Sequence, residues 1–238
     1  MCLLTYIPYA NGGFVVTSNR DEHINRKRAL APKRLKVADK ELICPVDPVS
    51  KGTWIGTSSC YTVVLLNGGL EKHIATPPYK MSRGQVVLEC IKYNKPIEFY
   101  EQFDFSGFEP FTLVIFYNNQ QSPILEIVWT GTEKIKTEID NTQTRIWSSS
   151  TLYNREARQK REAWFTDFLT ENKDEISADD LLELHHCGGS TDKENGFLMA
   201  RENGIRTVSM TQIELKENTK MIQYNDLVQG ISKSYRIY

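Results

Sequence analysis

The residues with the clearest chemical potential lie at the start of this 238-residue sequence. Cys2 precedes an apolar run over residues 3–8, and a second β-rich run over residues 14–18 leads into Asn-Arg-Asp at positions 19–21. An Asn-Gly turn between two such runs predicts a β-hairpin, in which the first strand starts beside the end of the second. The hairpin therefore predicts that a thiol, a guanidinium and a carboxylate meet at one end of a sheet.

The position of Cys2 suggests a specific chemistry. Removal of Met1 is expected because the second residue is small, and Cys2 would then carry both a thiol and a free α-amine. An α-amine with a pKa of about 7.7–8.0 can take the thiol proton near neutral pH. Arg20 would favour the thiolate, and Asp21 would hold the amine in place. Alternatively, Cys2 is a small buried hydrophobe and the charged residues only mark a strand end.

A second candidate group ends the strand expected over residues 61–66. Asn67 precedes two glycines, which is typical of a turn. An amide at a strand end can also donate a hydrogen bond to a developing oxyanion. From these residues alone the turn is the favoured interpretation of Asn67.

An ordered set of short motifs resembles the NRDE family, also called the transport and Golgi organisation 2 family. In the family's order the motifs are Met-Cys at 1–2, Asn-Arg-Asp-Glu at 19–22, Gly-Thr-Trp-Ile-Gly at 52–56, Leu-Leu-Asn at 65–67, Ser-Arg-Gly at 82–84 and Gly-Ile-Arg-Thr at 204–207. The family is similar to N-terminal-nucleophile (Ntn) hydrolases of the bile-salt and penicillin V acylase type. One position departs from the pattern, because Ser149 stands where the family often has asparagine.

The resemblance implies an amidohydrolase that cleaves a non-peptide C–N bond of a small molecule through a thioester on Cys2. The other residues that it assigns to the site are Arg20, Asp21, Asn67, Ser149 and Arg206 for catalysis, and Asn19 and Trp54 for substrate binding. It also turns the interpretation of Asn67 toward an oxyanion donor, joined by Ser149. Arg206, ordinarily a surface or ion-pairing residue at a strand start, would face the site.

A function of another class uses the same pocket without catalysis. The family's ties to Golgi organisation and haem handling imply a protein that binds or traffics a lipid-like ligand or haem. The serine at position 149 is compatible with this alternative, and Cys2 would then be an iron ligand or a structural residue. The expected partner is a small molecule, an acyl amide or a lipid-like compound, and no resident cofactor is expected. The sequence leaves the oligomeric state open.

Bulk composition indicates an ordinary soluble globular chain. Hydrophobic residues make up 40% and charged residues 25%, and a formal net charge of −1 gives no reason to expect nucleic acid as a partner. No run approaches the roughly 20 apolar residues of a membrane span, and the N-terminus lacks the pattern of a signal peptide. Five scattered cysteines favour reduced thiols and a cytoplasmic protein. No metal is expected at His185-His186-Cys187, because adjacent helical positions point in different directions.

Hydrophobic periodicity predicts strands grouped apart from helices, which indicates the α+β class. Besides the hairpin, strands are expected at 53–57, 61–66, 111–117, 124–129, 134–139, 145–147, 206–215 and 221–224. Helices are expected after an N-cap at Ser82 with Gln85 completing a capping box, and at 97–100, 153–172 and 178–186. The basic stretch 23–40 is expected to be an exposed irregular loop, with a site rim that attracts anions as the alternative, and 192–203 to be a polar loop. The resemblance implies one domain over 1–238 with the αββα sandwich of Ntn hydrolases, two antiparallel sheets covered by helices.

Overall fold

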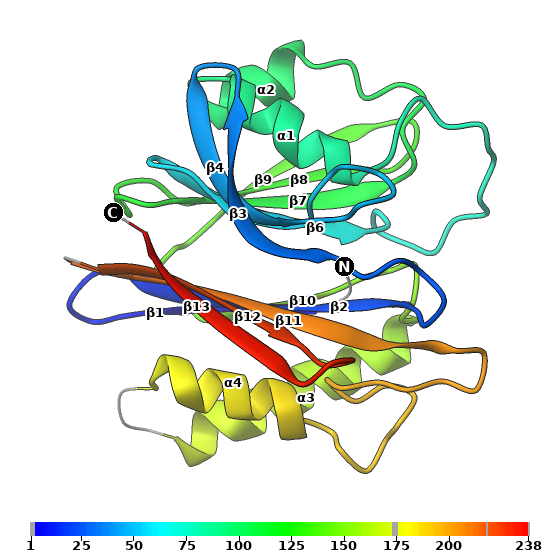
Figure 1. Ribbon diagram of the computed structural model, residues 1–238, viewed down its shortest axis with the longest axis vertical. Helices are drawn as coiled ribbons and strands as arrows, with labels where there is room; N and C mark the ends of the chain where they lie inside the picture. The colour runs from blue at the N-terminus through cyan, green and yellow to red at the C-terminus, as the bar shows by residue number, and fades with distance from the viewer. Residues whose placement is uncertain (1–2, 173–175, 218, 238) are drawn as a thin grey trace. The chain divides into compact units, whose positions relative to one another are not determined.

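The computed structural model describes residues 3–172, 176–217 and 219–237. The chain forms two compact units (Figure 1). Unit 1 combines the N-terminal stretch that ends at Arg26, the segment Thr142–Ser148, and the C-terminal stretch that begins at Tyr153. Unit 2 consists of Lys27–Asn141 and Ser149–Leu152. The single domain expected over 1–238 stays a prediction.

Unit 1 is a six-stranded antiparallel sheet with two helices against one face (Figure 1). In spatial order its strands are β10 (Arg145–Ser148), β1 (Leu3–Pro8), β2 (Phe14–His23), β11 (Ile205–Lys216), β12 (Thr219–Asp226) and β13 (Ile231–Ile237). The helices are α3 (Arg155–Glu171) and α4 (Ala178–Cys187). Apolar side chains of β1 and β2 pack with Phe165 of α3 and Leu181 of α4, which gives this unit its core on the helix-covered face.

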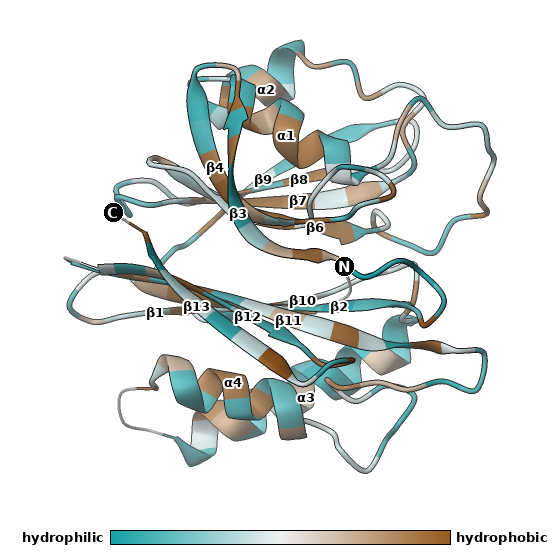
Figure 2. Cartoon of the chain, viewed as in Figure 1, coloured by the Kyte–Doolittle hydropathy of each residue, from teal (hydrophilic) through white to brown (hydrophobic). Residues whose placement is uncertain are grey.

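Unit 2 is a seven-stranded antiparallel sheet with its own two helices. In spatial order its strands are β3 (Leu30–Val37), β4 (Lys40–Val46), β5 (Ile55–Thr57), β6 (Tyr61–Asn67), β7 (Phe111–Tyr117), β8 (Ile124–Trp129) and β9 (Lys134–Ile139). The helices are α1 (Gly84–Lys92) and α2 (Pro96–Gln102). Figure 2 shows the apolar residues of α1, which pack with β6 and β7 in a single hydrophobic cluster.

These two sheets and their helices confirm the α+β class with antiparallel sheets covered by helices. The opening hairpin is also confirmed, with a register that pairs Leu3 with Asn19 and Pro8 with Phe14. Its turn depends on Gly13, which has a φ of +90°. A Cβ added at this residue would lie 2.1 Å from the carbonyl oxygen of Leu215, so a side chain does not fit there. None of the helices in the described part of the chain is long and apolar enough to cross a membrane.

Three local expectations are wrong. The stretch 23–40 contains β3, an edge strand whose Lys and Arg side chains are largely exposed and whose register shifts between Leu30 and Lys33, around Pro32. Basic residues and proline are typical of sheet edges, so their abundance concealed a strand. The capping box is absent, because α1 begins at Gly84 without a side-chain cap and Gln85 instead donates to the carbonyl of Ser50 at 2.6 Å. Strand β13 was not expected, because its mostly exposed residues carry no clear alternation.

Candidate functional site

The predicted nucleophile, Cys2, lies outside the described residues. It directly precedes Leu3 in the sequence, and Leu3 pairs with Asn19 in the hairpin. Arg20 and Asp21, the charged residues expected around the nucleophile, directly follow Asn19 on β2 and belong to the described part of the chain. β2 lies between β1 and β11, and the residues from Thr17 to Asp21 are all buried.

Arg20 and Asp21 lie at the same end of β2 but face opposite sides of the sheet. Asn19 and Asp21 point to the helix-covered face, where Asn19 contacts His185 of α4 and Asp21 contacts Tyr153, which precedes α3. Successive side chains of a strand alternate between faces, so Arg20 points to the other face. The sequence placed these residues at one sheet end, and the pleat then separates the guanidinium from the carboxylate.

Asp21 is held by two hydroxyl groups. The Tyr153 hydroxyl donates to Oδ2 at 2.6 Å, and the Thr207 hydroxyl donates to Oδ1 at 2.6 Å. Thr207 lies directly opposite Asp21 in the β2–β11 ladder, just before a register shift in β11. Hydrogen bonds to a carboxylate are strong, so this pair fixes the orientation of the Asp21 side chain.

Tyr153 is itself fixed by a buried arginine. The guanidinium of Arg161 lies 3.5 Å from the centre of the Tyr153 ring, and Arg161 is fully buried. Its Nε donates to the carbonyl of Asn195 at 2.8 Å and its Nη2 to that of Gly196 at 2.7 Å. The polar stretch 192–203 is therefore tied to α3 through Arg161, and the cation stacks on the ring that contacts Asp21.

Asn19 belongs to a buried chain of hydrogen bonds that runs through His185. Its Nδ2 donates to the carbonyl of Phe197 at 2.8 Å, which directs its Oδ1 to Nδ1 of His185 at 2.8 Å. Nδ1 must therefore carry the proton, and Nε2 accepts from the hydroxyl of Thr5 at 2.8 Å. Burial, and then the positive charges of Arg161 and His186, lower the pKa of His185 to about 3. The imidazole is a neutral link between β1, β2 and α4.

Sequence reasoning missed Tyr153, Arg161, His185 and Thr207. Position 185 is four residues after Leu181, which places His185 on the apolar face of α4, and Arg161 interrupts the buried stripe of α3 in the same way. A polar side chain at a core position needs buried partners, so both were detectable as network residues. No local sequence signal connects Tyr153 or Thr207 to Asp21. The described residues hold no group of three His, Cys, Asp or Glu side chains that could bind a metal.

Arg20 faces an arginine-rich end of the sheet. Its side chain is 7% exposed, and its Nη2 lies 3.4 Å from Oε2 of Glu22. The same carboxylate oxygen is 3.3 Å from Nε of Arg26. Arg206, which was expected to face the site, is half-buried and pairs with Glu22 in the β2–β11 ladder. Arg20 and Arg26 thus contact one glutamate, and Arg206 pairs with the same residue in the ladder, so positive charge exceeds negative charge among these four residues.

The remaining candidates, Asn67, Ser149 and Trp54, lie in unit 2. Asn67 ends β6, and its backbone carbonyl accepts a hydrogen bond from the Ser149 hydroxyl at 2.6 Å. The next residue, Gly68, has a φ of +91° and leaves room for Ser150, whose Oγ would lie 2.2 Å from an added Cβ. Trp54 is buried, and its carbonyl accepts from the amide of Leu65 in β6 at 2.8 Å. The structure thus brings Ser149 directly against Asn67.

The other four cysteines are free thiols with different environments. Cys44 and Cys90 are buried, and burial raises the pKa of each thiol to about 12. Cys60 and Cys187 are exposed. Because the thiolate is the reactive form, Cys44 and Cys90 are poor nucleophiles in the folded protein.

Comparison with protein families gives one match. The family model described as Transport and Golgi organisation 2 matches residues 1–231, which includes every candidate residue of both units. No curated protein matches the chain.

Proposed function

Because the chain belongs to the Transport and Golgi organisation 2 family, we propose that it is an N-terminal-nucleophile amidohydrolase acting on a small-molecule amide. Removal of Met1 would give Cys2 a free α-amine, which takes the thiol proton as the thiolate attacks the amide carbonyl carbon. The tetrahedral oxyanion collapses to a thioester, and the amine leaves with a proton. Water then attacks the thioester, which releases the acid and restores the thiol.

The observation that carries this proposal is the β1–β2 register. Leu3 pairs with Asn19, so the described part of β1 begins at the end of β2 where buried Arg20 lies, and we propose that Cys2 acts beside it. A nearby guanidinium favours a thiolate over a thiol. Asp21, oriented by Tyr153 and Thr207, is proposed to hold the α-amine.

The hydrogen bonds of the candidates refine their proposed roles. A serine hydroxyl has one proton, and that of Ser149 is donated to the carbonyl of Asn67. Ser149 is therefore proposed as a positioning residue, and the Asn67 amide as the oxyanion donor. Asn19, whose amide contacts Phe197 and His185, is likewise proposed to position β2. Arg206 and Trp54 are proposed to contact the substrate.

Brief labelling with iodoacetamide at pH 7, followed by peptide mapping, tests the nucleophile. Cys2 should react faster than every other cysteine, including the exposed Cys60 and Cys187. An intact mass without Met1 should accompany this reactivity, because the α-amine is the proposed base. Equal labelling of Cys2 and Cys60 in folded protein would count against the assignment.

Turnover provides the second test. Incubation with a panel of N-acyl amides and β-lactams should leave an acyl adduct on Cys2 that mass spectrometry detects. Cys2→Ala should abolish the adduct, and Cys2→Ser should lower turnover sharply while the fold is kept. Asn67→Ala should lower kcat by about 10²–10³-fold and change KM much less, because an oxyanion donor acts mainly in the transition state.

One observation favours a second candidate function, binding without catalysis. Ser149 stands where the family often has asparagine, and its hydroxyl proton is donated to the backbone carbonyl of Asn67 rather than to a ligand. The family description, transport and Golgi organisation, fits a trafficking-associated protein, and we propose a lipid-like molecule or haem as its ligand. Fatty acyl and haem binding, read by thermal shift and absorbance, should then survive Cys2→Ala. Such binding with no turnover of any amide would replace the hydrolase proposal.

We propose a reducing, cytoplasmic setting for either function. Four of the five cysteines are free thiols in the described structure, and no disulfide joins any two of them. Free thiols persist in compartments where glutathione and thioredoxin keep cysteine reduced. Purified protein should therefore keep its unfolding midpoint when a reductant is added.

A further inference from the structure

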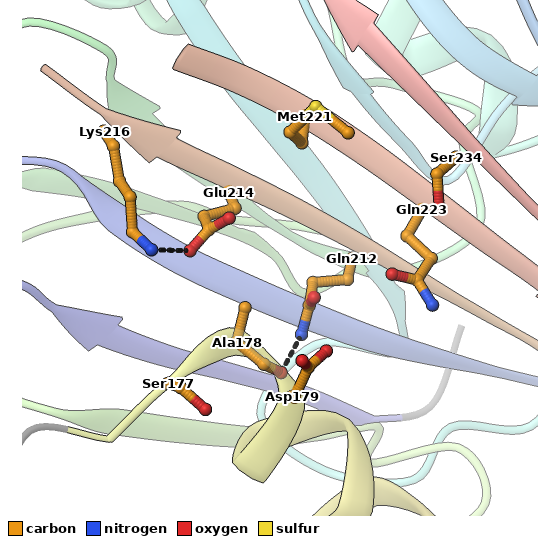
Figure 3. Close-up of a pocket in the computed structure, with 9 residues that line it drawn as sticks. All are labelled: Ser177, Ala178, Asp179, Gln212, Glu214, Lys216, Met221, Gln223 and Ser234. Atoms are coloured by element: carbon orange, nitrogen blue, oxygen red, sulfur yellow. Dashed lines mark hydrogen bonds and ion pairs between the residues drawn. The ribbon is translucent and has the colours of Figure 1, made fainter. Parts of the chain in front are cut away.

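A cavity of about 200 Å³ lies on the helix-covered face of unit 1, between the start of α4 and strands β11, β12 and β13 (Figure 3). Its lining residues are Ser177, Ala178, Asp179, Gln212, Glu214, Lys216, Met221, Gln223 and Ser234. Asn19 and Asp21 point to the same face of the sheet, but none of the residues that line this cavity belongs to the site proposed above. Sites for drug-sized ligands usually measure about 300–1,000 Å³, so this one suits a smaller molecule.

Gln212 directs a fixed acceptor into the cavity. Its side chain is buried at 4% exposure, and its Nε2 donates to the carbonyl of Ala178 and the hydroxyl of Thr17, both at 2.8 Å. The Ala178 carbonyl only accepts, so the nitrogen must face it and Oε1 must point elsewhere. Within the described residues no donor bonds this Oε1. Figure 3 shows the Gln212 side chain between those of Glu214 and Asp179.

Two carboxylates provide the other acceptors. Glu214 uses one oxygen, Oε1, for both of its contacts, which are with Nζ of Lys216 at 2.8 Å and the hydroxyl of Tyr9 at 2.7 Å. In the part of the chain that the structure describes, its Oε2 has no donor and Asp179 has no cationic partner. The cavity therefore holds two carboxylates against one ammonium and offers three acceptors to a ligand.

An anion is disfavoured at this end of α4 although helix N-termini usually attract one. The first turn already carries Asp179 and Asp180, and the capping box between Ser177 and Asp180 satisfies donors at the helix start. A cation with several N–H donors matches the acceptors instead. A primary ammonium has three such donors, and half-buried Met221 gives an apolar wall for a short aliphatic stem.

We propose that this cavity is a second binding site, which takes a small primary amine in its ammonium form. Asp179, Gln212 Oε1 and Glu214 Oε2 accept its three N–H groups, and the stem lies along Met221. Gln223 and Ser234 at the far side suit a polar group at the other end of the stem. The site does not depend on the proposed hydrolase activity.

Titration of the full-length protein with n-butylamine tests the proposal, with 1-butanol and butyrate as neutral and anionic controls. In ¹H–¹⁵N spectra the side-chain amides of Gln212 and Gln223 should shift saturably with butylamine and with neither control. Asp179→Asn should weaken binding about tenfold or more, because it removes a charge-assisted hydrogen bond. Glu183→Gln, which removes an exposed carboxylate elsewhere on α4, should leave the affinity unchanged.

A size variant separates a built site from loose charge attraction. Met221→Phe leaves every charge in place but occupies part of the cavity, so it should reduce butylamine binding while the folded spectrum is kept. Equal shifts with butanol and butylamine, unchanged affinity in Asp179→Asn or in Met221→Phe, or absence of saturable shifts in the parent protein would each overturn the proposal.

Discussion

Replacement of His185 should change how the stability of the protein depends on pH. The imidazole is fully buried and links Thr5 to Asn19, and burial lowers its pKa in the folded state to about 3. In the unfolded chain its pKa returns to about 6.5. Between these values the unfolded state binds more protons than the folded state, so stability rises with pH. The contribution of neutral, buried His185 to the free energy of unfolding is fully present above about pH 6.5 and is lost as the pH falls toward 3.

The magnitude follows from the two pKa values. At pH 5.5 the unfolded imidazole is about nine-tenths protonated while the folded one is still neutral. Relative to pH 7.5 the folded state therefore loses about 1.4 kcal/mol through this one group. For a chain of 238 residues that corresponds to roughly 3–5 °C in the unfolding midpoint. At pH 5.5 most carboxylates are still ionised, so the histidine contribution can be resolved there.

Urea unfolding at pH 7.5, 6.5 and 5.5 provides the assay. His185→Gln should be less stable than the parent at pH 7.5, by about 1–3 kcal/mol, because Thr5 and Asn19 lose a buried partner. Its stability should then fall less between pH 7.5 and 5.5 than that of the parent, by about 1.4 kcal/mol. His186→Gln, which changes the exposed neighbour on α4, should keep the parental pH dependence. Equal losses in the parent and in His185→Gln would refute the reasoning.

Three further predictions concern single residues of the fold. Gly68→Ala should lower stability by at least about 1–2 kcal/mol, because φ is +91° and the new Cβ meets Ser150; an unchanged unfolding midpoint would contradict this. Ser177→Ala should lower the free energy of unfolding by about 1 kcal/mol, because it removes the N-cap of α4. The unfolding transition of parent and variant, followed by circular dichroism, checks this. Cys90, with a thiol pKa of about 12, should resist iodoacetamide at pH 8 while exposed Cys60 reacts, and equal labelling would show that the core opens readily.

The sequence by itself determined most of the strands, the four helices within a few residues, and the hairpin that opens the chain. These elements carry local signals: Asn-Gly at a turn, strong alternation or β-branched runs, and a buried stripe on α3. Strand β4, which contains Pro45, was missed, and so were β3 and β13, which are edge strands with mostly exposed side chains. Such strands depend on pairing with a neighbour rather than on burying an apolar face, so periodicity could not reveal them.

The candidate site divides in the same way between local and long-range information. The ordered motifs sufficed to assign the family, and turn chemistry with strand alternation sufficed to place Asn19, Arg20 and Asp21 at one sheet end. Their partners come from residues far along the chain, since Tyr153 and Thr207 reach Asp21 across 132 and 186 positions. Which residues meet across a sheet face is decided by strand order and by the register shift in β11. Only the tertiary structure contains that information, because no local sequence pattern encodes pairing between distant strands.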